Sequence, residues 1–248
     1  MPARAASPRS YNQLCGIAAA LDVIGDRWTT LVVRDLLLGP LRFGDLAEAM
    51  PGIGTNTLAA RLKHLESAGV VQRTLLPLPN RGTAYELTDY GRELQPILMA
   101  LGRWGTKSMG RLPTDVTARS RWLVGAMPAF HDDRRRVAQP TTWELRLTDG
   151  AFTVHAQGKG FSVAAGAPGD ADLIVTTRDD VLHALLAGGL ATADAVESGA
   201  VTLEGDAAAL PLLLELCRFP RQPQRPNSSS GSMPTASGIR AHCSGRPR

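Results

Sequence analysis

Apolar residues in the first part of the chain recur every three to four positions, a pattern that predicts short amphipathic helices. The apolar stripes indicate helices over about residues 17–24, 26–38 and 43–50. Asp26 is the expected N-cap of the second helix, and Gly39 with Pro40 is expected to end it. A Pro-Gly turn follows the third helix, so a further helix is expected to begin shortly after it.

This next helix has the best-defined boundaries in the chain. With Gly54 as N-cap, Ile53 and Leu58 have the spacing of a hydrophobic staple, and Gly69 is expected to end the helix. The predicted buried stripe consists of Leu58, Leu62 and Leu65. Polar and cationic residues occupy the other faces, so this helix and the one before it predict a helix-turn-helix.

Two short strands are predicted directly after this helix, in the segment VVQRTLLPLPNRGTAYELT, joined by a loop of Pro, Asn, Arg and Gly. A basic helix followed at once by a hairpin with a cationic tip is the order of elements in a winged helix. In that arrangement the helix enters the major groove and the hairpin lies along the neighbouring backbone. The candidate DNA-contacting residues are Arg42, Thr55, Asn56, Thr57, Arg61, Lys63, His64, Asn80 and Arg81.

Several of these positions have an expected partner. Hydroxyl and backbone N–H groups at the N-terminal end of the helix suit phosphate, while Asn56 suits an adenine edge. Arg61 has two alternatives, a guanine or an acidic residue of its own domain. Arg81 is expected to contact the DNA backbone or the minor groove from the wing tip. For Arg42, the alternatives are a phosphate contact and a plain surface position.

A longer apolar pattern over residues 89–109 predicts a helix with one wide apolar face. Thr88 is its expected cap, and Pro96 is expected to kink it or to remove one backbone hydrogen bond. The apolar face consists of Leu94, Ile97, Leu98, Leu101 and Trp104. A small domain would leave this face exposed, so these residues are expected to pair with a second copy in a homodimer.

In the second half of the chain the apolar pattern changes from helical spacing to alternation. After a helix expected near residues 115–127, three alternating segments between residues 143 and 165 predict an antiparallel meander. A fourth strand over 172–177, a helix, a short strand over 201–204 and a final helix follow. The predicted fold class is therefore α+β, with a winged helix-turn-helix ahead of an α+β domain that has an antiparallel sheet.

Charge is unevenly distributed along the chain. Residues 1–115 hold 13 Lys or Arg against 10 Asp or Glu, whereas residues 116–218 hold 9 against 13. Of these two regions, only the first has a positive net charge, which suits binding to a phosphate backbone. The last segment, 219–248, has 5 arginines and no acid and is rich in Ser, Pro and Gly, so it is expected to be a disordered basic tail.

Composition argues against several other classes. The hydrophobic fraction of 44% suffices for a globular core, and no apolar run reaches the ~20 residues needed to span a membrane. The N-terminus lacks a secretory signal, so a cytoplasmic protein with no membrane partner is expected. The 3 cysteines and 5 histidines show no ligand-like spacing, and no Ser/His/Asp set is evident. We therefore expect no metal, no cofactor and no enzymatic activity.

Blocks of this sequence resemble the HxlR-type winged-helix regulators, relatives of the MarR group. GDRW, LLLGPLRFGDL, PGI, LAARLKHLESAGVV and YELTDYGREL occur between residues 15 and 105 in the order and spacing of that family. The resemblance implies a homodimeric bacterial transcription regulator. Some members sense oxidants with an N-terminal cysteine, and Cys15 matches that place. A small buried apolar residue is the alternative interpretation of Cys15.

Residues 141–218 resemble a sterol-carrier-protein-like fold, most clearly in the block SGAVTLEGD. The resemblance implies a twisted sheet and helices around an apolar cavity for lipids or similar molecules. The candidate ligand-binding residues are Trp143, Phe152, Phe161, Leu182 and Leu186. Core packing is the alternative for the aromatic residues of this set, which lie on one side of the meander.

The sequence thus predicts a two-domain transcription regulator. The expected divisions are a disordered segment 1–11, a winged helix-turn-helix DNA-binding and dimerisation domain 12–110, a helical linker 111–140, a sterol-carrier-like domain 141–219 and a tail 220–248. The expected partners are double-stranded DNA with a pseudo-palindromic operator, a second copy of the chain and a small apolar ligand that modulates DNA binding. The alternatives are a regulator switched by oxidation at Cys15, and a small-molecule carrier or protein-interaction module whose winged helix contacts only proteins.

Overall fold

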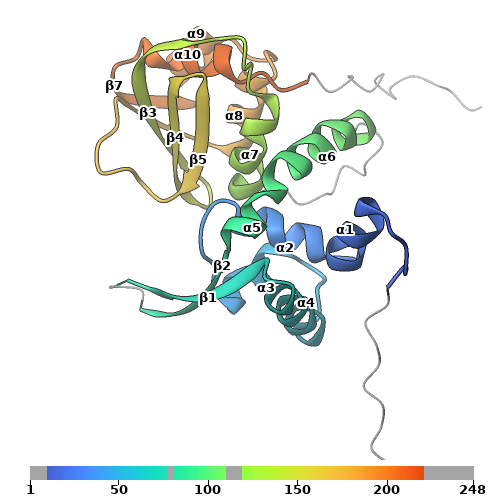
Figure 1. Cartoon of the computed structure of the whole chain (residues 1–248). Helices are drawn as coiled ribbons and strands as arrows, with labels where there is room; N and C mark the ends of the chain where they lie inside the picture. Colours follow the sequence, from blue (N-terminus) through green and yellow to red (C-terminus); the bar gives the residue numbers. More distant parts are fainter. Residues whose placement is uncertain (1–9, 78–80, 110–118, 221–248) are drawn as a thin grey trace, which may run out of the picture.

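A computed structural model describes residues 10–77, 81–109 and 119–220 (Figure 1). The first part of the chain forms the helices and the hairpin of a winged helix-turn-helix. Its elements are α1 (Gly16–Ile24), α2 (Thr29–Leu36), α3 (Phe43–Ala49), α4 (Thr55–Ser67), β1 (Val71–Leu76) and β2 (Gly82–Leu87). β1 and β2 pair antiparallel and project away from the helices as the wing (Figure 1). The predicted disordered end segments lie almost entirely outside the described residues.

One buried cluster holds the winged helix-turn-helix together. Leu58, Leu62 and Leu65 of α4 are at most 1% exposed, which confirms the predicted stripe. The same cluster contains Val32, Val33 and Leu36 of α2, Leu46 of α3, and Val71 and Leu87 of the wing. Gly52 sits in the turn between α3 and α4 with φ +89, a conformation that favours glycine. The leucine stripe therefore fixes which side of α4 faces away from the protein.

The second helix begins later than predicted, so Asp26 is not its N-cap. α2 starts at Thr29, and the preceding Trp28 has φ 79 and ψ −24, in the left-handed region. The carbonyl of Asp26 accepts the N–H of Thr29 at 3.1 Å, which closes a turn ahead of the helix. Trp28 packs against the helix-turn-helix cluster, and this packing offsets a backbone strain on the order of 1–3 kcal/mol.

The helix predicted over residues 89–109 is broken at Glu93. The two resulting helices are α5 (Asp89–Arg92) and α6 (Leu94–Met109). Pro96 explains the break, because it has no N–H for the carbonyl of Arg92 and its ring clashes with that carbonyl. Thr88 caps α5 as predicted, with its hydroxyl oxygen accepting a backbone N–H at 3.0 Å.

The second part of the chain is an α+β unit built on one five-stranded sheet (Figure 1). Its helices are α7 (Ser120–Ala126), η1 (Met127–Phe130), α8 (Asp179–Leu186), α9 (Thr192–Glu197) and α10 (Ala209–Leu216). Its strands are β3 (Val137–Leu147), β4 (Gly150–Gly158), β5 (Gly160–Ala165), β6 (Leu173–Thr177) and β7 (Val201–Gly205). The strand order is β5-β4-β3-β6-β7, and residues of all four α-helices share one buried cluster with the sheet.

The sheet is mixed, which corrects the predicted antiparallel arrangement. β3, β4 and β5 form the expected antiparallel meander, but β6 runs parallel to β3, with Val175 opposite Leu145. Polar and apolar residues alternate with the same period in both kinds of pairing. The pattern therefore predicts the strand β6 without fixing its direction.

Part of the segment predicted as a linker, 111–140, belongs to the core of the C-terminal part. Val124 and Met127 are fully buried, and Val137 is 6% exposed. All three belong to the cluster that contains Trp143. The C-terminal unit therefore includes α7 and η1 as structural elements of its own.

Helix α7 joins the two parts of the chain through α2. The guanidinium of Arg121 donates two hydrogen bonds to the carbonyl of Asp35, at 2.9 and 2.7 Å, and one to the carbonyl of Gly39, at 3.2 Å. The carbonyl of Asp35 lies in the last turn of α2, where a cation is favourable, and that of Gly39 lies in the loop just after it. Leu38 packs in the C-terminal core, and its carbonyl accepts the N–H of Ala165 at 2.9 Å. Polar contacts and shared apolar packing both connect the two parts.

Candidate nucleic-acid interface

The exposed face of α4 lies opposite its leucine stripe. Its exposed residues are Thr55, Asn56, Thr57, Ala59, Ala60, Lys63 and Ser67. The helix begins after Gly54, as predicted, and the first N–H groups of a helix have no intrahelical partner. The small side chains in the middle of this face leave room for close approach. The Lys63 ammonium forms no ion pair with any described residue, so it is available to a phosphate.

Two of the predicted DNA contacts on α4 face their own domain. Arg61 forms an ion pair with Asp26, just ahead of α2, which is the second of the two alternatives for this arginine. His64 is half-buried, and its Nε2 lies 3.0 Å from the carbonyl oxygen of Val23 in α1. Both side chains therefore brace α4 against α1 and the residues that follow it.

Arg42 connects the wing to the helix-turn-helix. Its Nη2 donates to the carbonyl of Arg81 at 3.2 Å, and a Cβ added at Gly82 would lie 3.3 Å from its guanidinium. The backbone N–H of Arg42 donates to the carboxylate of Asp45 at 3.0 Å at the start of α3. Arg81 is exposed just before the start of β2, while the predicted contact Asn80 lies outside the described residues. Arg42 thus positions the wing that carries Arg81.

A second support for the wing was missed by the sequence analysis. Arg73 on β1 donates to Glu66 near the end of α4 at 2.9 Å, and its guanidinium lies 5.6 Å from the ring centre of Tyr85 on β2. The hydrogen bond to Glu66 raises the pKa of Arg73 above its ordinary value. Arg73 and Tyr85 are opposite each other in the hairpin, so the strand register was the signal that could have revealed this contact.

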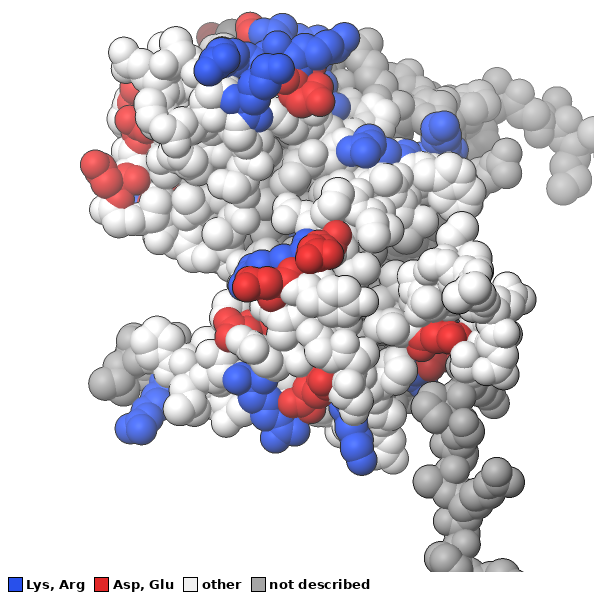
Figure 2. Space-filling model, viewed as in Figure 1, with Lys and Arg blue, Asp and Glu red and all other residues white. Residues whose placement is uncertain are grey.

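Lys and Arg side chains are spaced along the side of the molecule that carries α3, α4 and the wing, while the densest group of cations in this view lies over the C-terminal part (Figure 2). Figure 2 shows separate Lys and Arg side chains along the lower edge, with fewer acidic side chains among them. This spacing of cations along an edge suits several phosphates of one duplex, because each cation that meets a phosphate displaces a counterion. In this arrangement the exposed helix α4 is free to enter a groove of the duplex, and the hairpin of β1 and β2 lies beside it, held by Arg42 and Arg73.

The apolar residues predicted to form a dimer contact lie on two different sides of α6, one packed against the protein and one exposed. Leu98 is 9% exposed and Leu94 is half-buried, and both contact the helix-turn-helix cluster. Ile97, Leu101 and Trp104 point away from that cluster, with exposed fractions of 54%, 50% and 68%. Helical spacing places these three side chains in one stripe. The large exposed apolar residues of α1 are Ile17 and Leu21.

The residues predicted to line a ligand cavity are mostly part of the C-terminal core. Trp143, Phe152, Leu182 and Leu186 are at most 3% exposed and belong to one buried cluster. The indole N–H of Trp143 donates to the carbonyl of Ala209 at 2.9 Å, which satisfies its only polar group. Phe161 is half-buried and stacks on His131, with ring centres 4.8 Å apart. Core packing accounts for this burial, and the ligand role of these residues stays a prediction.

The two cysteines within the described residues differ in environment. Cys15 is exposed at the start of α1, where the nearby backbone N–H groups of Ala18 and Ile17 lower the pKa of its thiol. Cys217 is buried in the C-terminal core, and burial raises the pKa of its thiol. The thiolate is the reactive form, so Cys15 is the more reactive of the two.

Among the residues described, no group of His, Cys, Asp and Glu side chains has the arrangement of a metal site. The helices of the same residues are all too short or too polar to cross a membrane.

Two family models match the two parts of the chain, and α7 lies between the matches. The model of the HxlR-like helix-turn-helix family matches residues 23–112, and the model of the SCP-2 sterol transfer family matches residues 129–217. The second match begins in η1, in agreement with the burial of this helix in the C-terminal core.

Curated relatives match the first part. The chain is 40% identical over 94 residues to the HTH-type transcriptional regulator sll1512 of Synechocystis sp. (strain PCC 6803), a match that covers 38% of this chain and 69% of the relative. It is 40% identical over 88 residues to the HTH-type transcriptional regulator YvaP of Bacillus subtilis, covering 36% and 82%. The reduced form of the transcriptional regulator YodB from B. subtilis superposes with a TM-score of 0.35 at 31% identity, covering 41% of this chain and 100% of YodB.

Proposed function

The chain belongs to the HxlR-like helix-turn-helix family of DNA-binding transcription regulators, and we propose that it binds a pseudo-palindromic operator as a homodimer under the control of a small ligand. The single observation that carries the proposal is the exposed face of α4. It combines Asn56 near the N-terminal end with Lys63 about two turns further on, and the leucine stripe keeps it facing away from the protein.

The roles on the duplex follow from the chemistry of this face. Asn56 reads a base edge in the major groove, while Thr55, Thr57 and Lys63 contact phosphates. Arg81 reaches the neighbouring backbone or minor groove from the wing. Arg61 and His64 support α4 from behind, which is the role that their contacts with α1 and Asp26 favour.

The exposed stripe of Ile97, Leu101 and Trp104 supports the homodimer. A monomer would leave these three large apolar side chains in water, and burial against a second copy is favourable by about 25 cal/mol per Å² of apolar surface. Two-fold symmetry then places two α4 helices on one side of the dimer. The half-sites of the operator are accordingly expected about one helical turn apart or a multiple of it.

In this proposal the C-terminal part binds the ligand that regulates DNA binding. It is attached to α2 through Arg121 and Leu38, so a ligand that favours one arrangement of the two parts changes the affinity for DNA. Operator affinity measured with and without each candidate ligand tests this step. If every compound that binds the protein leaves operator affinity unchanged, the regulatory part of the proposal fails.

DNA binding is tested with fragments that the wild-type protein selects from a random pool. Lys63→Ala and Arg81→Ala are each expected to weaken binding to all fragments and to lower the slope of log affinity against log salt by about 1. Asn56→Ala is expected to relax the preference at one base pair, by about 1–3 kcal/mol. Arg178→Ala is the control, because it removes an exposed arginine from the C-terminal part.

The same experiment separates the alternative of a carrier or protein-interaction module. Such a protein selects no DNA sequence, and its residual affinity for DNA responds equally to the three variants and to the control. That result would overturn the proposal.

A further inference from the structure

Two arginines at the start of α7 each bind the C-terminal end of a helix in the winged helix-turn-helix. Arg121 contacts the last turn of α2 through the carbonyl of Asp35. Arg119 contacts the last turn of α3, where its Nη2 donates to the carbonyl of Glu48 at 2.9 Å and its Nη1 lies 3.7 Å from the carboxylate of the same residue. The last carbonyls of a helix have no intrahelical partner, so a guanidinium is favourable at both places.

Ser120, between these two arginines, holds the same end of α7 in the C-terminal part. The residue is fully buried, and its hydroxyl donates to the carboxylate of Asp179 at the start of α8 at 2.6 Å. Its backbone N–H donates to the carboxylate of Asp149, in the turn between β3 and β4, at 3.2 Å. Val124 of the same helix is fully buried in the C-terminal core. The start of α7 is therefore bonded to both parts of the chain at once.

The contact at Glu48 lies close to the start of α4 along the chain, because only residues 50–54 separate α3 from α4. Met50 is 2% exposed, and its carbonyl accepts the N–H of Ile53 at 3.1 Å, which closes the turn between the two helices. A short closed turn with a buried first residue absorbs little displacement. A shift of the end of α3 therefore moves the first turn of α4, which carries Asn56.

The contact of Arg119 is less complete than that of Arg121. The Nε–H of Arg119 is buried and has no hydrogen-bond partner among the described residues, whereas the Nε–H of Arg121 donates to the carbonyl of Asp35 at 2.9 Å. A buried donor without a partner is unfavourable. Of the two contacts, that of Arg119 is therefore the one that rearranges more easily when α7 moves.

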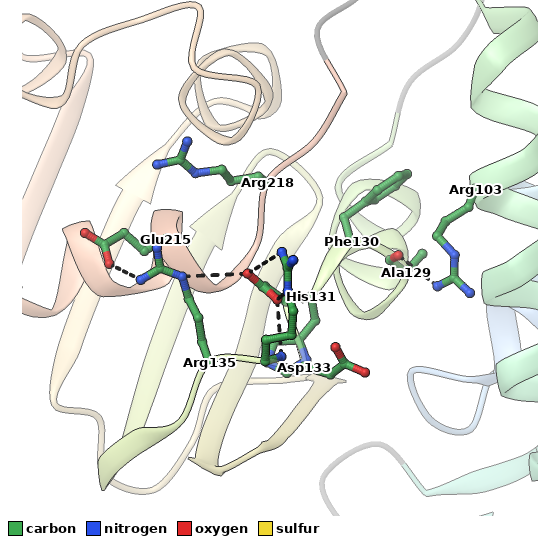
Figure 3. Close-up of a pocket in the computed structure, with 10 residues that line it drawn as sticks. Arg103, Ala129, Phe130, His131, Asp133, Arg135, Glu215 and Arg218 are labelled. Atoms are coloured by element: carbon green, nitrogen blue, oxygen red, sulfur yellow. Dashed lines mark hydrogen bonds and ion pairs between the residues drawn. The ribbon is translucent and has the colours of Figure 1, made fainter.

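A third arginine joins the two parts, with its guanidinium on the side of the first part. Arg103 of α6 donates to the carbonyl of Ala129 in η1 at 2.9 Å, beside a pocket of about 650 Å³ (Figure 3). The C-terminal part is thus held by α2, α3 and α6. Of these three helices, α3 is the one that leads directly into α4.

We propose that Arg119 is a positioning residue for DNA binding, through which the C-terminal part sets the placement of the first turn of α4. The inference rests on the proposed function, because it assigns the route by which the C-terminal part acts on the helix that enters the groove. The route runs from the start of α8 through Asp179 and Ser120 to Arg119, and from there through the end of α3 to α4. A change that moves the start of α8 moves the first turn of α4 with it.

Hydrogen exchange of the full-length protein without DNA tests this route. In Arg119→Gln and in Ser120→Ala, the backbone amides of residues 50–58 are expected to exchange roughly threefold faster than in the wild type, or more. Residues 143–147 of β3 are the internal reference, because faster exchange there reports global unfolding. Arg178→Gln is the control variant, since it removes an exposed arginine of the C-terminal part. Wild-type exchange at residues 50–58 in either test variant would overturn the proposal.

Operator affinity distinguishes positioning from a general loss of charge or of folded protein. Arg119→Gln is expected to weaken binding to the selected fragments roughly three- to tenfold. Arg119→Lys keeps the charge and N–H donors for the carbonyl of Glu48, so it is expected to recover most of the loss. No recovery in Arg119→Lys would contradict a role for this contact.

A second substitution on α4 shows where the effect of Arg119→Gln acts. In an Asn56→Ala background the loss should shrink to about twofold, because the base contact that it misplaces is already gone. In a Lys63→Ala background the loss should persist, because Lys63 lies about two turns further along α4. Equal losses in the wild type and in both backgrounds would overturn the proposal.

The two measurements separate this inference from the proposed function. If the protein selects operator DNA but Arg119→Gln changes neither exchange nor affinity, only the inference fails. If Arg119→Gln speeds exchange at residues 50–58 as expected but the protein selects no DNA, the proposed function fails and the link between α7 and α4 stands.

Discussion

The indole N–H of Trp122 donates a hydrogen bond of 3.1 Å to the carboxylate of Asp35, a buried acid of the DNA-binding half. Arg34 pairs with the same carboxylate at 3.0 Å and lies 4.5 Å from the centre of the Trp122 ring. Two consecutive residues of α7, Arg121 and Trp122, thus engage the backbone carbonyl and the side chain of one aspartate. Asp35 is therefore the main residue of the winged helix-turn-helix through which α7 of the C-terminal part is held.

Stability is expected to depend on pH through Asp35. Burial raises the pKa of its carboxyl above the ordinary value, although Arg34, Arg121 and Trp122 each oppose the shift. The folded protein therefore holds this proton more tightly than the unfolded chain does. The contribution of Asp35 is most favourable below its unfolded pKa of about 3.9, declines as the pH rises through the folded pKa, and is constant above it.

Asp35→Asn removes this titration and keeps an oxygen acceptor for Trp122. We expect the free energy of unfolding of the wild type, minus that of Asp35→Asn, to fall as the pH rises from about 4 toward neutrality. Urea unfolding at a series of pH values measures this difference. A difference that is constant or rises with pH would contradict the assignment of a raised pKa.

The ion pair between Asp26 and Arg61 is expected to limit DNA affinity. Asp26→Asn removes a negative charge beside α4 and releases the Arg61 guanidinium toward solvent. We expect tighter operator binding by several-fold at low salt, and a salt slope steeper by up to about 1. Asp180→Asn is the matched control, because it makes the same charge change and frees Arg178 in the C-terminal part. Equal effects of the two variants would show that only net charge matters.

The exposed stripe of α6 is expected to be the dimer contact. Leu101→Glu places a charge in an apolar contact, so we expect the variant to be monomeric at concentrations where the wild type is dimeric. Operator affinity should fall by at least tenfold, because each protomer then binds one half-site alone. Gln95→Glu adds the same charge at another exposed position of α6 and should remain dimeric. Sedimentation velocity gives the oligomeric state. A dimeric Leu101→Glu protein would exclude this contact.

Thiol reactivity should distinguish the cysteines. In a Cys243→Ser protein, iodoacetamide is expected to modify Cys15 within minutes and Cys217 only after unfolding, because Cys15 is exposed with a lowered pKa and Cys217 is buried. Mass spectrometry of the native and the urea-treated protein measures both rates. A redox role for Cys15 additionally requires that oxidants change operator affinity in the wild type and not in Cys15→Ser. If both proteins respond alike, the thiol-switch alternative is excluded.

Much of the fold could be predicted because its determinants are local. The spacing of Leu58, Leu62 and Leu65 indicates both the helix α4 and its buried face, and Gly54 indicates its start. The alternation around Trp143 indicates a strand in the same way. Such patterns depend only on which positions along an element face the core.

The site was less predictable because its side-chain partners are distant in sequence. Arg61 and Asp26 are 35 positions apart, and which of two alternatives the arginine takes depends on how α4 packs beside the residues ahead of α2. Trp122 and Asp35 are 87 positions apart and belong to different parts of the chain. Local patterns carry no information about such pairs, so the connection between the two parts was not foreseen.

The burial of Leu38 in the C-terminal core has a consequence for protein engineering. A hybrid that exchanges the second half of this chain for that of another regulator would leave this leucine facing a foreign surface. Any sensor module fused to the winged helix must therefore provide an apolar pocket for Leu38. Otherwise the loop after α2 has to be redesigned together with the fusion.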